Sequence, residues 1–585
     1  MKTYFLFFLL FLLTLPACGP DPIVPKGTVF IRYEGAVTNL NPYVAGPGGY
    51  SRYASQQIFQ TLGMLDPETL ELAPLLVTNL PKSRKVEDGP FAGKLAFDFE
   101  MRPEATWDDG SPITGKDYEF TLKLIYHPLL PAGIWKGYFE DLAGVEVDEA
   151  NPKKFTIYTN KYYILGLESM CQVPVYPQYH YDPKGALSKI ALADLINAES
   201  SKSLEEDPAQ KEFATEFQDP KYGVDPKFIN GSSAYRLEKL DGDRGLTLKR
   251  KAKWWGDKVA NKNPLLRAFP ETLEYRVVKA EDAVESMLRA QELDVALNIN
   301  GQHFKEMQAD PDLSALYDFK TRWTSTFSRC IFNMRSPKLE DKKVRQALAK
   351  LADYDYFINT VSAGMAERTV GPISPAKEYY AKDIKTHELD PGAARTMLAE
   401  AGWEDSNGNG IVDKMIDGKK VELELDVLYS PNSNTTEMVA NSLAATMQQG
   451  GVRINLVPMD IRNITKTTRE GNFEAALLAA AMFPGNAEVF PLYHSSMLAP
   501  NGDNRSGLVN AELDELLDKI RDTEDPAART PLYVQAQEIL YDETPELYLY
   551  APEQRYIVAK KFDYVISSDR PGFNEQFFKL KETQE

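Results

Sequence analysis

The sequence of 585 residues contains few of the residues on which catalytic and metal sites depend. Cysteine occurs 3 times and histidine 5 times. The histidines are scattered, without the HExxH or paired spacing of zinc ligands, at positions His127, His180, His303, His387 and His494. The GxSxG elbow, the P-loop and a GxGxxG turn between strand and helix are absent as well. We therefore expect no catalytic centre and no cofactor.

Positive charge is also scarce. The chain has 66 Lys and Arg residues against 85 Asp and Glu residues, a formal net charge of −19. Nucleic-acid binding depends on clustered Lys and Arg that neutralise phosphates. This composition therefore excludes nucleic acid as an expected partner, and the acidity itself indicates little beyond solubility.

Long apolar runs are absent after the N-terminus. The run from Tyr4 to Leu13 is nearly unbroken, but a transmembrane helix needs about 20 such residues. A run of this length behind Lys2 is typical of the apolar part of a signal peptide. We predict a signal peptide over residues 1–17.

Cys18 follows this segment directly. The stretch Leu15-Pro16-Ala17-Cys18 resembles a bacterial lipobox, in which the cysteine is diacylated and becomes the first mature residue, although Pro16 departs from the usual pattern. Three prolines within residues 18–26 favour an extended tether. We predict a protein lipid-anchored to a membrane of the cell envelope; the alternative is an ordinary signal peptide with an incidental cysteine.

The other two cysteines, Cys171 and Cys330, lie far apart in the sequence. In an exported protein they can pair in a disulfide. Free, buried thiols are the second interpretation.

The length and the hydrophobic content of the chain indicate several folded units. Domains contain about 100 to 200 residues each, so this length predicts about three, and 43% hydrophobic residues suffice for their cores. Thr114 and Asp117 have capping-box spacing before a helix that Pro128 ends. Alternating runs such as "GTVFIRY" and "VELELDVLY" predict strands. The pattern is α/β with mixed sheets.

One stretch, "DSNGNGIVD", resembles a calcium loop. Oxygen-bearing side chains occupy loop positions 1, 3, 5 and 9: Asp405, Asn407, Asn409 and Asp413. Gly410 stands at position 6, but position 12 is Ile416, so the bidentate acid is missing. The two interpretations are a tight turn and a weak calcium site.

Several ordered motifs resemble one protein family. Residues 107–114, "WDDGSPIT", with Asp117, Tyr118 and Phe120, are similar to the most diagnostic motif of the extracytoplasmic solute-binding proteins of family 5, the dipeptide-, oligopeptide- and nickel-binding components of ABC importers. The stretches "IFNMRSPKLEDKKVRQALAKLAD" and "RTPLYVQAQEILYDETPELYLY" resemble further family motifs. Such matches cover nearly all of the mature chain, in order.

The resemblance implies an α/β, three-domain, periplasmic-binding-protein-like fold, with mixed β-sheets flanked by helices and two lobes joined by a hinge. The implied domains are domain I (25–62, 205–320 and 550–585), domain II (63–204) and domain III (321–549). Two crossing strands, near "SRCIFNM" and "ELYLYAP", would connect the lobes. Closure about this hinge would bury a ligand at the interface.

The implied function is capture of a peptide or peptide-like solute and its delivery to the permease subunits of an ABC importer, by a monomer. Alternatives are a binding lipoprotein for a non-peptide solute, a chemosensory role without an importer, and a hydrolase or lectin of similar shape. A nickel ligand is a specialisation within the family. His494, in "PLYHSS", is interpreted as a packing or hinge residue.

The resemblance also suggests where the ligand binds. Peptide-binding members carry an Asp that pairs with the peptide ammonium, but here Gly485 or Asn486 stands in its place. A buried ammonium without a partner is costly. Our hypothesis is that free-amine peptides are not preferred, or are held through Glu488. The candidate ligand-binding residues are Tyr43, Tyr50, Arg52, Arg368, Met482, Phe483, Asn486 and Glu488.

Overall fold

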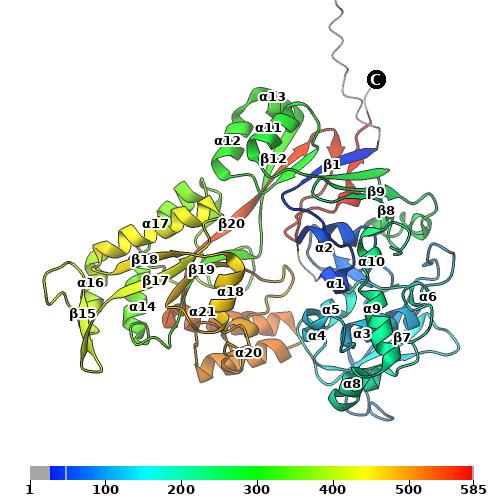
Figure 1. Ribbon diagram of the computed structural model, residues 1–585, viewed down its shortest axis with the longest axis horizontal. Helices are drawn as coiled ribbons and strands as arrows, with labels where there is room; N and C mark the ends of the chain where they lie inside the picture. Colours follow the sequence, from blue (N-terminus) through cyan, green and yellow to red (C-terminus); the bar gives the residue numbers. More distant parts are fainter. Residues whose placement is uncertain (1–26, 46–48, 583–585) are drawn as a thin grey trace, which may run out of the picture.

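The computed structural model describes residues 27–45 and 49–582. The predicted signal peptide (1–17), Cys18 and the tether (18–26) lie outside the described residues. Two lobes stand side by side, with the segments from 28 to about 320 mostly in one and those from about 326 to 550 in the other (Figure 1). Within the described part of the chain, no helix is long and apolar enough to cross a membrane.

The first lobe contains the N-terminal half of a large mixed sheet. Its strands are β1 (Thr28–Tyr33), β8 (Tyr235–Asp241), β9 (Gly245–Arg250), β10 (Thr272–Val277) and β11 (Val295–Leu297). Strand β1 is parallel to both β10 and β11, and all six of its side chains are buried. A strand covered on both faces is mostly apolar, as in Val29-Phe30-Ile31, and the buried Arg32 donates to the carbonyl oxygens of Val278 and Leu297.

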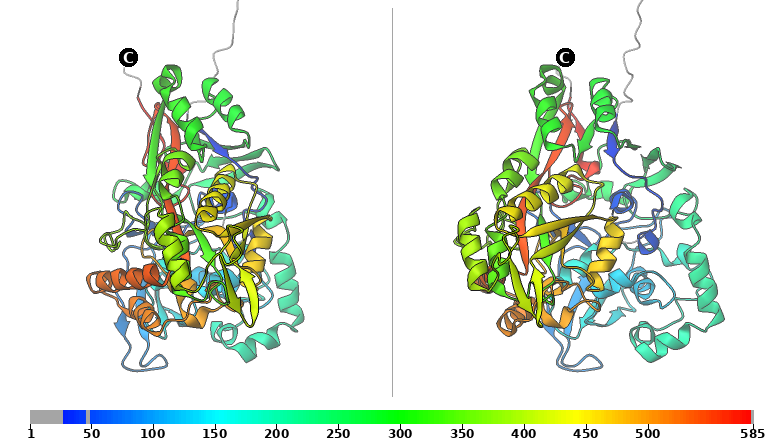
Figure 2. Two further views of the ribbon diagram at one scale, coloured as in Figure 1. Left: turned by 90° about the vertical axis from the view of Figure 1, so that its left-hand side faces the viewer. Right: turned by 60° about the vertical axis from the view of Figure 1, so that its left-hand side comes forward.

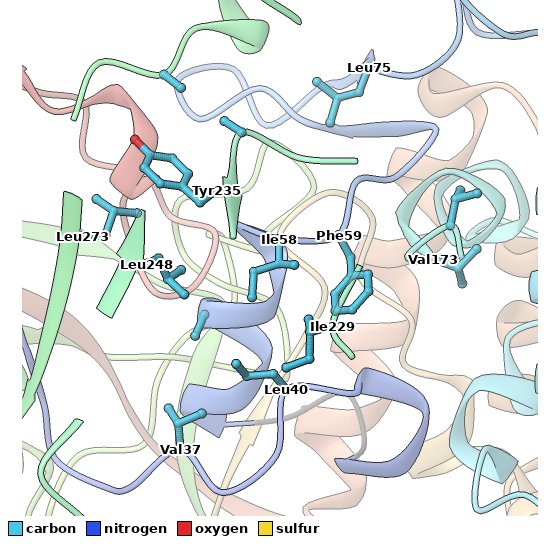
Figure 3. Close-up of a cluster of buried hydrophobic side chains, with 14 of the residues drawn as sticks. Val37, Leu40, Ile58, Phe59, Leu75, Val173, Ile229, Tyr235, Leu248 and Leu273 are labelled. Atoms are coloured by element: carbon cyan, nitrogen blue, oxygen red, sulfur yellow. The ribbon is translucent and has the colours of Figure 1, made fainter. Parts of the chain in front are cut away.

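A four-stranded antiparallel sheet completes this lobe. Its order is β4 (Arg84–Lys85), β5 (Leu95–Glu100), β7 (Lys154–Thr159) and β6 (Leu142–Val147). The nearby helices are α2 (Gly49–Gln56), α3 (Gly115–Tyr126), α4 (Gly133–Gly137), α5 (Gly166–Gln172) and α9 (Pro208–Phe217). One hydrophobic core joins both sheets. Figure 3 shows part of it, where Leu248 and Leu273 of the large sheet lie near Ile58.

The start of α3 is held as its sequence predicts. The backbone N–H of Thr114 donates to the Asp117 carboxylate (2.9 Å), closing a capping box. In the turn before it, Trp107 is buried, and Asp108 pairs with Lys251 Nζ at 2.7 Å. This motif therefore ties the two sheets of the first lobe together, which is a scaffolding role.

The second lobe is built on the other half of the large sheet. Its strands are β13 (Thr326–Phe332), β17 (Glu424–Tyr429), β18 (Arg453–Pro458) and β19 (Ala475–Ala481). Helices α14 (Lys342–Ala349), α16 (Pro391–Glu400), α17 (Asn434–Gln449), α18 (Ile461–Arg469), α20 (Ala511–Asp522) and α21 (Pro526–Glu543) surround it. The core of this lobe is a separate cluster that includes Trp403, Leu425 and Leu443.

Two strands cross between the lobes, as predicted. Strand β20 (Glu546–Ala559) pairs with β13 in the second lobe and then with β11 and β12 (Tyr317–Trp323) in the first. Strands β12 and β13 form the other crossing, through Thr324 and Ser325. Figure 2 shows β20, in red, linking the lobes from two further directions.

A buried ion pair ties these crossing strands together on the side of the second lobe. The Arg329 guanidinium lies 2.9 Å from the Glu546 carboxylate, and both side chains are almost fully buried. The hydroxyl of Tyr493 donates to the other carboxylate oxygen. Both Glu546 oxygens are therefore satisfied.

The two cysteines in the described residues are free and buried. Cys171 packs in the core of the first lobe and Cys330 in that of the second. The interpretation as free thiols is confirmed, because the two side chains belong to different cores.

Candidate functional site: the cleft between the lobes

The carboxyl ends of three parallel strands define one edge of the second lobe. Strand β17 is parallel to β18 and to β19, so all three end at the same edge. In open α/β sheets, ligands bind outside the carboxyl ends of the strands. The loops that leave this edge begin at Ser430, Met459 and Met482.

A groove at this edge is lined by both lobes. It encloses about 1240 Å³, adjoining solvent included. Its hydroxyl-bearing lining residues are Thr326, Ser328, Ser362, Ser430, Ser433, Thr435, Thr436 and Tyr550. Gly301 and Arg555 contribute from the side of the first lobe. Hydroxyl groups both donate and accept hydrogen bonds, so the groove suits a polar solute.

Strand β19 lines this groove with Leu477, Leu478 and the small side chain of Ala479. Ala479 and Ala481 are exposed on the same face of β19, opposite Ser328 and Thr326 of the crossing strand β13. Small residues at alternating positions leave space above the sheet. The run "AALLAAA" carried this signal, which the sequence analysis did not use.

A second hollow, of about 460 Å³ with adjoining solvent included, lies where the lobes touch. Its lining residues from the first lobe are Arg52, Trp135, Tyr138, Phe139, Glu168, Ser169, Gln172 and Val173, and Phe483 comes from the second. The rings of Tyr138 and Phe483 are perpendicular, with centroids 5.6 Å apart. This edge-to-face contact spans the lobe interface.

The lobes also meet through backbone and apolar contacts beside this hollow. The N–H of Ile164 donates to the carbonyl oxygen of Arg521 (3.1 Å). Ile164 and Leu165 pack in one apolar cluster with Val489 and Leu517 of the second lobe. The structure therefore shows the lobes in a closed arrangement.

Charged side chains gather at the same contact. Burial raises the pKa of Glu168 from 4.5 to about 7, and burial also raises the pKa of Asp569. Burial lowers the pKa of Lys377, whose ammonium group donates to the carbonyl oxygens of Pro484 and Gly485. The lobe interface is thus a low-dielectric site that contains ionisable groups of both signs.

Three predicted ligand residues lie elsewhere. Tyr43 is fully buried and donates its hydroxyl to the carbonyl oxygen of Pro174 (2.6 Å), so its prediction as a cleft residue is wrong: it is a core residue. Tyr50 packs against Tyr33 at 4.5 Å between centroids. The Arg368 guanidinium lies 3.2 Å from the Tyr354 ring centroid, inside the second lobe. Neither Tyr50 nor Arg368 lines the two cavities.

Glu488 is already engaged by the protein. Its side chain is 6% exposed, lies 3.4 Å from Nε of Arg521, and accepts from the N–H of Phe490 (3.1 Å). Burial raises the pKa of Glu488, and Arg521 opposes that shift. In this arrangement Glu488 is paired with Arg521, and the hypothesis that Glu488 binds an ammonium group stays a prediction.

Other predicted residues do meet at the interface. Arg52 and Phe483 line the same hollow. Met482 donates its backbone N–H to Ser325 (2.7 Å), and Asn486 is half-buried in the same loop. Glu168, Gln172, Lys377 and Asp569 were not predicted. No motif marks them, since they come from three separate segments of the chain: α5, the segment around Lys377 and the segment around Asp569.

The "DSNGNGIVD" stretch forms a tight turn, and the weak calcium site stays a prediction. Asp405 accepts from the N–H groups of Gly408 and Gly410, and Asp413 pairs with Lys420 at 3.1 Å. The amide groups of Asn407 and Asn409 donate to Glu422. Across residues 27–45 and 49–582, no group of three or more His, Cys, Asp or Glu side chains could hold a metal ion.

His494 has packing partners, in line with its interpretation. Its ring stacks on Phe490, with centroids 4.1 Å apart, and Nδ1 lies 2.7 Å from the hydroxyl of Ser496.

The chain is similar to known solute-binding proteins along much of its length. It is 26% identical over 303 residues to the oligopeptide-binding protein AppA of Bacillus subtilis (strain 168), which is 51% of this chain and 53% of that protein. The match thus spans about half the length of this curated relative.

Solved structures extend the similarity of the fold. The oligopeptide-binding protein AppA from Bacillus subtilis in complex with a nonapeptide has a TM-score of 0.70 and 19% identity, covering 95% of this chain and 99% of that one. NikA from Brucella suis in complex with Fe(III)-EDTA has a TM-score of 0.74 and 17% identity, covering 95% and 100%. At these identities the likeness concerns the fold, and the predicted α/β periplasmic-binding-protein-like fold is confirmed.

The sequence model of one protein family matches most of the chain. Residues 87–497 match "Bacterial extracellular solute-binding proteins, family 5 Middle". The chain therefore belongs to the bacterial extracellular solute-binding proteins of family 5, and it is a solute-binding protein and not an enzyme.

Proposed function

We propose that this protein captures a peptide or peptide-like solute between its lobes and delivers it to an ABC importer. The observation that carries the proposal is the cleft itself, which the exposed Ala479 of β19 and many hydroxyl groups line. Such a surface suits an extended chain with varied side chains. The name of the relative AppA, an oligopeptide-binding protein, supports the same solute class.

The hinge supplies the mechanism. Strand β20 and the β12–β13 connection join the lobes, and the middle of β20, from Pro552 to Arg555, is only half-buried. Small backbone changes there would separate the lobes. A solute that contacts both lobes stabilises the closed form, which the permease subunits would recognise.

The test combines shape and stability. A panel of synthetic di-, tri- and pentapeptides is titrated into the purified protein. A true ligand should decrease the radius of gyration in solution scattering. It should also stabilise the fold by about 2.7 kcal/mol at a hundredfold excess over its dissociation constant. Mass spectrometry of solutes that co-purify with the protein decides between peptides and another solute, and a bound non-peptide would contradict the proposal.

We also propose that the protein is a monomer anchored through Cys18 on the extracytoplasmic side of a membrane. The lipobox-like stretch before Cys18 and the family of extracellular proteins support this location. Two or three acyl chains anchor stably, whereas one is marginal. Cys18→Ser should therefore move the protein to the soluble fraction, and a variant that stays with the membrane would contradict the anchor.

The domain division remains part of the proposal. Domains I (25–62, 205–320, 550–585) and II (63–204) would form the first lobe, and domain III (321–549) the second. The single core shared by the two sheets of the first lobe supports grouping domains I and II.

A further inference from the structure

One arginine of the second lobe lies against the first lobe and lines neither of the two cavities. Arg521 stands near the carboxyl end of α20, and its side chain is 20% exposed. In Figure 1, α20 lies low in the view beside the first lobe, whereas β20 crosses between the lobes higher up. Arg521 is absent from the lining of the groove and of the hollow. Its contacts therefore concern how the lobes meet.

The guanidinium group of Arg521 contacts two aromatic rings that belong to different lobes. Its central carbon lies 4.8 Å from the centroid of the Tyr163 ring, in the first lobe, and 4.2 Å from that of Phe490, in the second. Arginine favours such contacts because its guanidinium group is planar and weakly hydrated. The cation therefore joins an aromatic side chain of each lobe.

A buried acid holds the guanidinium group in this position. Oε2 of Glu488 lies 3.4 Å from Nε of Arg521, and Oε1 accepts the N–H of Phe490 (3.1 Å). The side chain of Tyr163 also acts on this acid, because its hydrogen bond lowers the pKa of Glu488 against the effect of burial. Separation of the lobes would remove Tyr163 from both charged groups, whereas Glu488 and Arg521 would stay together in the second lobe.

The backbone of Arg521 contacts the same segment of the first lobe. Its carbonyl oxygen accepts the N–H of Ile164 (3.1 Å), the residue that follows Tyr163. Farther along the chain, the hydroxyl of Ser83 in the first lobe donates to the carboxylate of Glu524 (3.2 Å). The N–H of Ile164 loses its acceptor when the lobes separate, so its exchange with solvent measures how often this contact opens.

We propose that Arg521 is a positioning residue for solute capture, which stabilises the closed arrangement of the lobes by its contact with Tyr163 and does not touch the solute. The contact joins the two lobes, so it favours the closed form in the empty and in the liganded protein alike. A solute then meets a protein whose binding-competent form is more populated. The inference rests on the proposed function, since it concerns the closure that captures the solute.

Hydrogen–deuterium exchange of the purified protein without added solute tests the proposal. Arg521→Gln removes the cation but keeps the backbone carbonyl that accepts from Ile164. Exchange of the Ile164 N–H should become about 3-fold to 30-fold faster, the range that corresponds to a cation–π contact. Strand β7 is paired on both sides within the first lobe, so its N–H groups should exchange at the native rate.

Further variants separate the ring contact from other effects. Tyr163→Leu should accelerate exchange of the Ile164 N–H by a similar factor, after correction for the intrinsic rate of the changed sequence. Tyr163→Phe keeps the ring and should retain most of the protection. Arg276→Gln is the matched control, because this guanidinium lies 4.3 Å from the Phe30 centroid and 2.8 Å from Glu274, all within the first lobe. It should leave the Ile164 rate unchanged.

Two outcomes would overturn the proposal. The first is a native exchange rate of the Ile164 N–H in both Arg521→Gln and Tyr163→Leu. The second is equal acceleration of the N–H groups of β7, because the substitutions would then act on global stability.

A solute measurement is separate from the exchange measurement. If a peptide of the panel binds, its dissociation should be faster in Arg521→Gln than in Arg276→Gln, and equal rates would contradict a role in capture. If no peptide binds, the proposed function fails, while exchange of the Ile164 N–H in the empty protein still decides whether Arg521 holds the lobes together.

Discussion

Two buried acids, Glu546 and Glu168, differ in how completely the protein satisfies them. Glu546 on a crossing strand pairs with Arg329 at 2.9 Å and accepts from Tyr493. Glu168 at the lobe contact has one hydrogen bond, from the Gln172 amide. Glu546 lies between two strands that stay paired within one lobe, whereas Glu168 lies where two lobes meet.

The two glutamates show that a buried carboxylate behaves differently according to how many partners surround it. A buried charge with all its partners fixes a structure, because any movement would expose unpaired groups. A buried acid whose pKa is raised by burial responds to protons at a pH closer to neutrality. The ion pair of Glu546 therefore fixes β13 and β20 within the second lobe, whereas Glu168 lies at the contact between the lobes.

Breaking the ion pair of Arg329 and Glu546 should have the largest effect on the free energy of unfolding. Glu546→Ala leaves the Arg329 guanidinium buried without its counter-charge, which costs about 3 to 5 kcal/mol in similar buried pairs. Denaturant unfolding measures the loss. The matched control is Glu168→Ala, which removes an acid with one hydrogen bond and should cost about 1 kcal/mol or less. Equal losses would contradict the comparison.

Proton binding at Glu168 should have an intermediate effect on the free energy of unfolding. The folded protein raises the pKa of this acid from 4.5 to about 7, so between these values it holds a proton that the unfolded chain has released. Stability should therefore fall as the pH rises from 4.5 to 7, by up to about 3 kcal/mol.

The control for the pH effect is Glu168→Gln, which cannot titrate. Burial also raises the pKa of Asp569 and of Glu575, so the native protein and the variant share those contributions. The difference in unfolding free energy between the two proteins should change with pH across that window. A constant difference would show that Glu168 does not titrate with folding.

Removing the aromatic contact between the lobes should have the smallest effect, and that effect is on ligand affinity. Tyr138 and Phe483 meet edge to face across the interface, and such pairs contribute about 0.5 to 1.5 kcal/mol beyond burial. A double-mutant cycle with Tyr138→Leu and Phe483→Leu should give this coupling energy in ligand affinity. Zero coupling would mean that the two rings do not meet in the liganded protein.

Local patterns predicted much of the fold. The capping box of Thr114 and Asp117 spans four residues, and the hydrogen bonds of the turn at Asp405 join residues fewer than ten positions apart. Residues close in the sequence therefore determine both structures. The order of family motifs extended these local predictions to the whole chain. The crossing strands β13 and β20 were located in this way.

The sequence by itself determined the family, the α/β architecture and the position of the hinge, because periodicity, caps and motifs act over short stretches. Only the tertiary structure decided the site. Folding placed Tyr43 in a core, paired Glu488 with Arg521, and brought Glu168 against Gly485, more than three hundred positions away. A carboxylate acquires its role from burial and from the partners around it, and both depend on which distant segments meet.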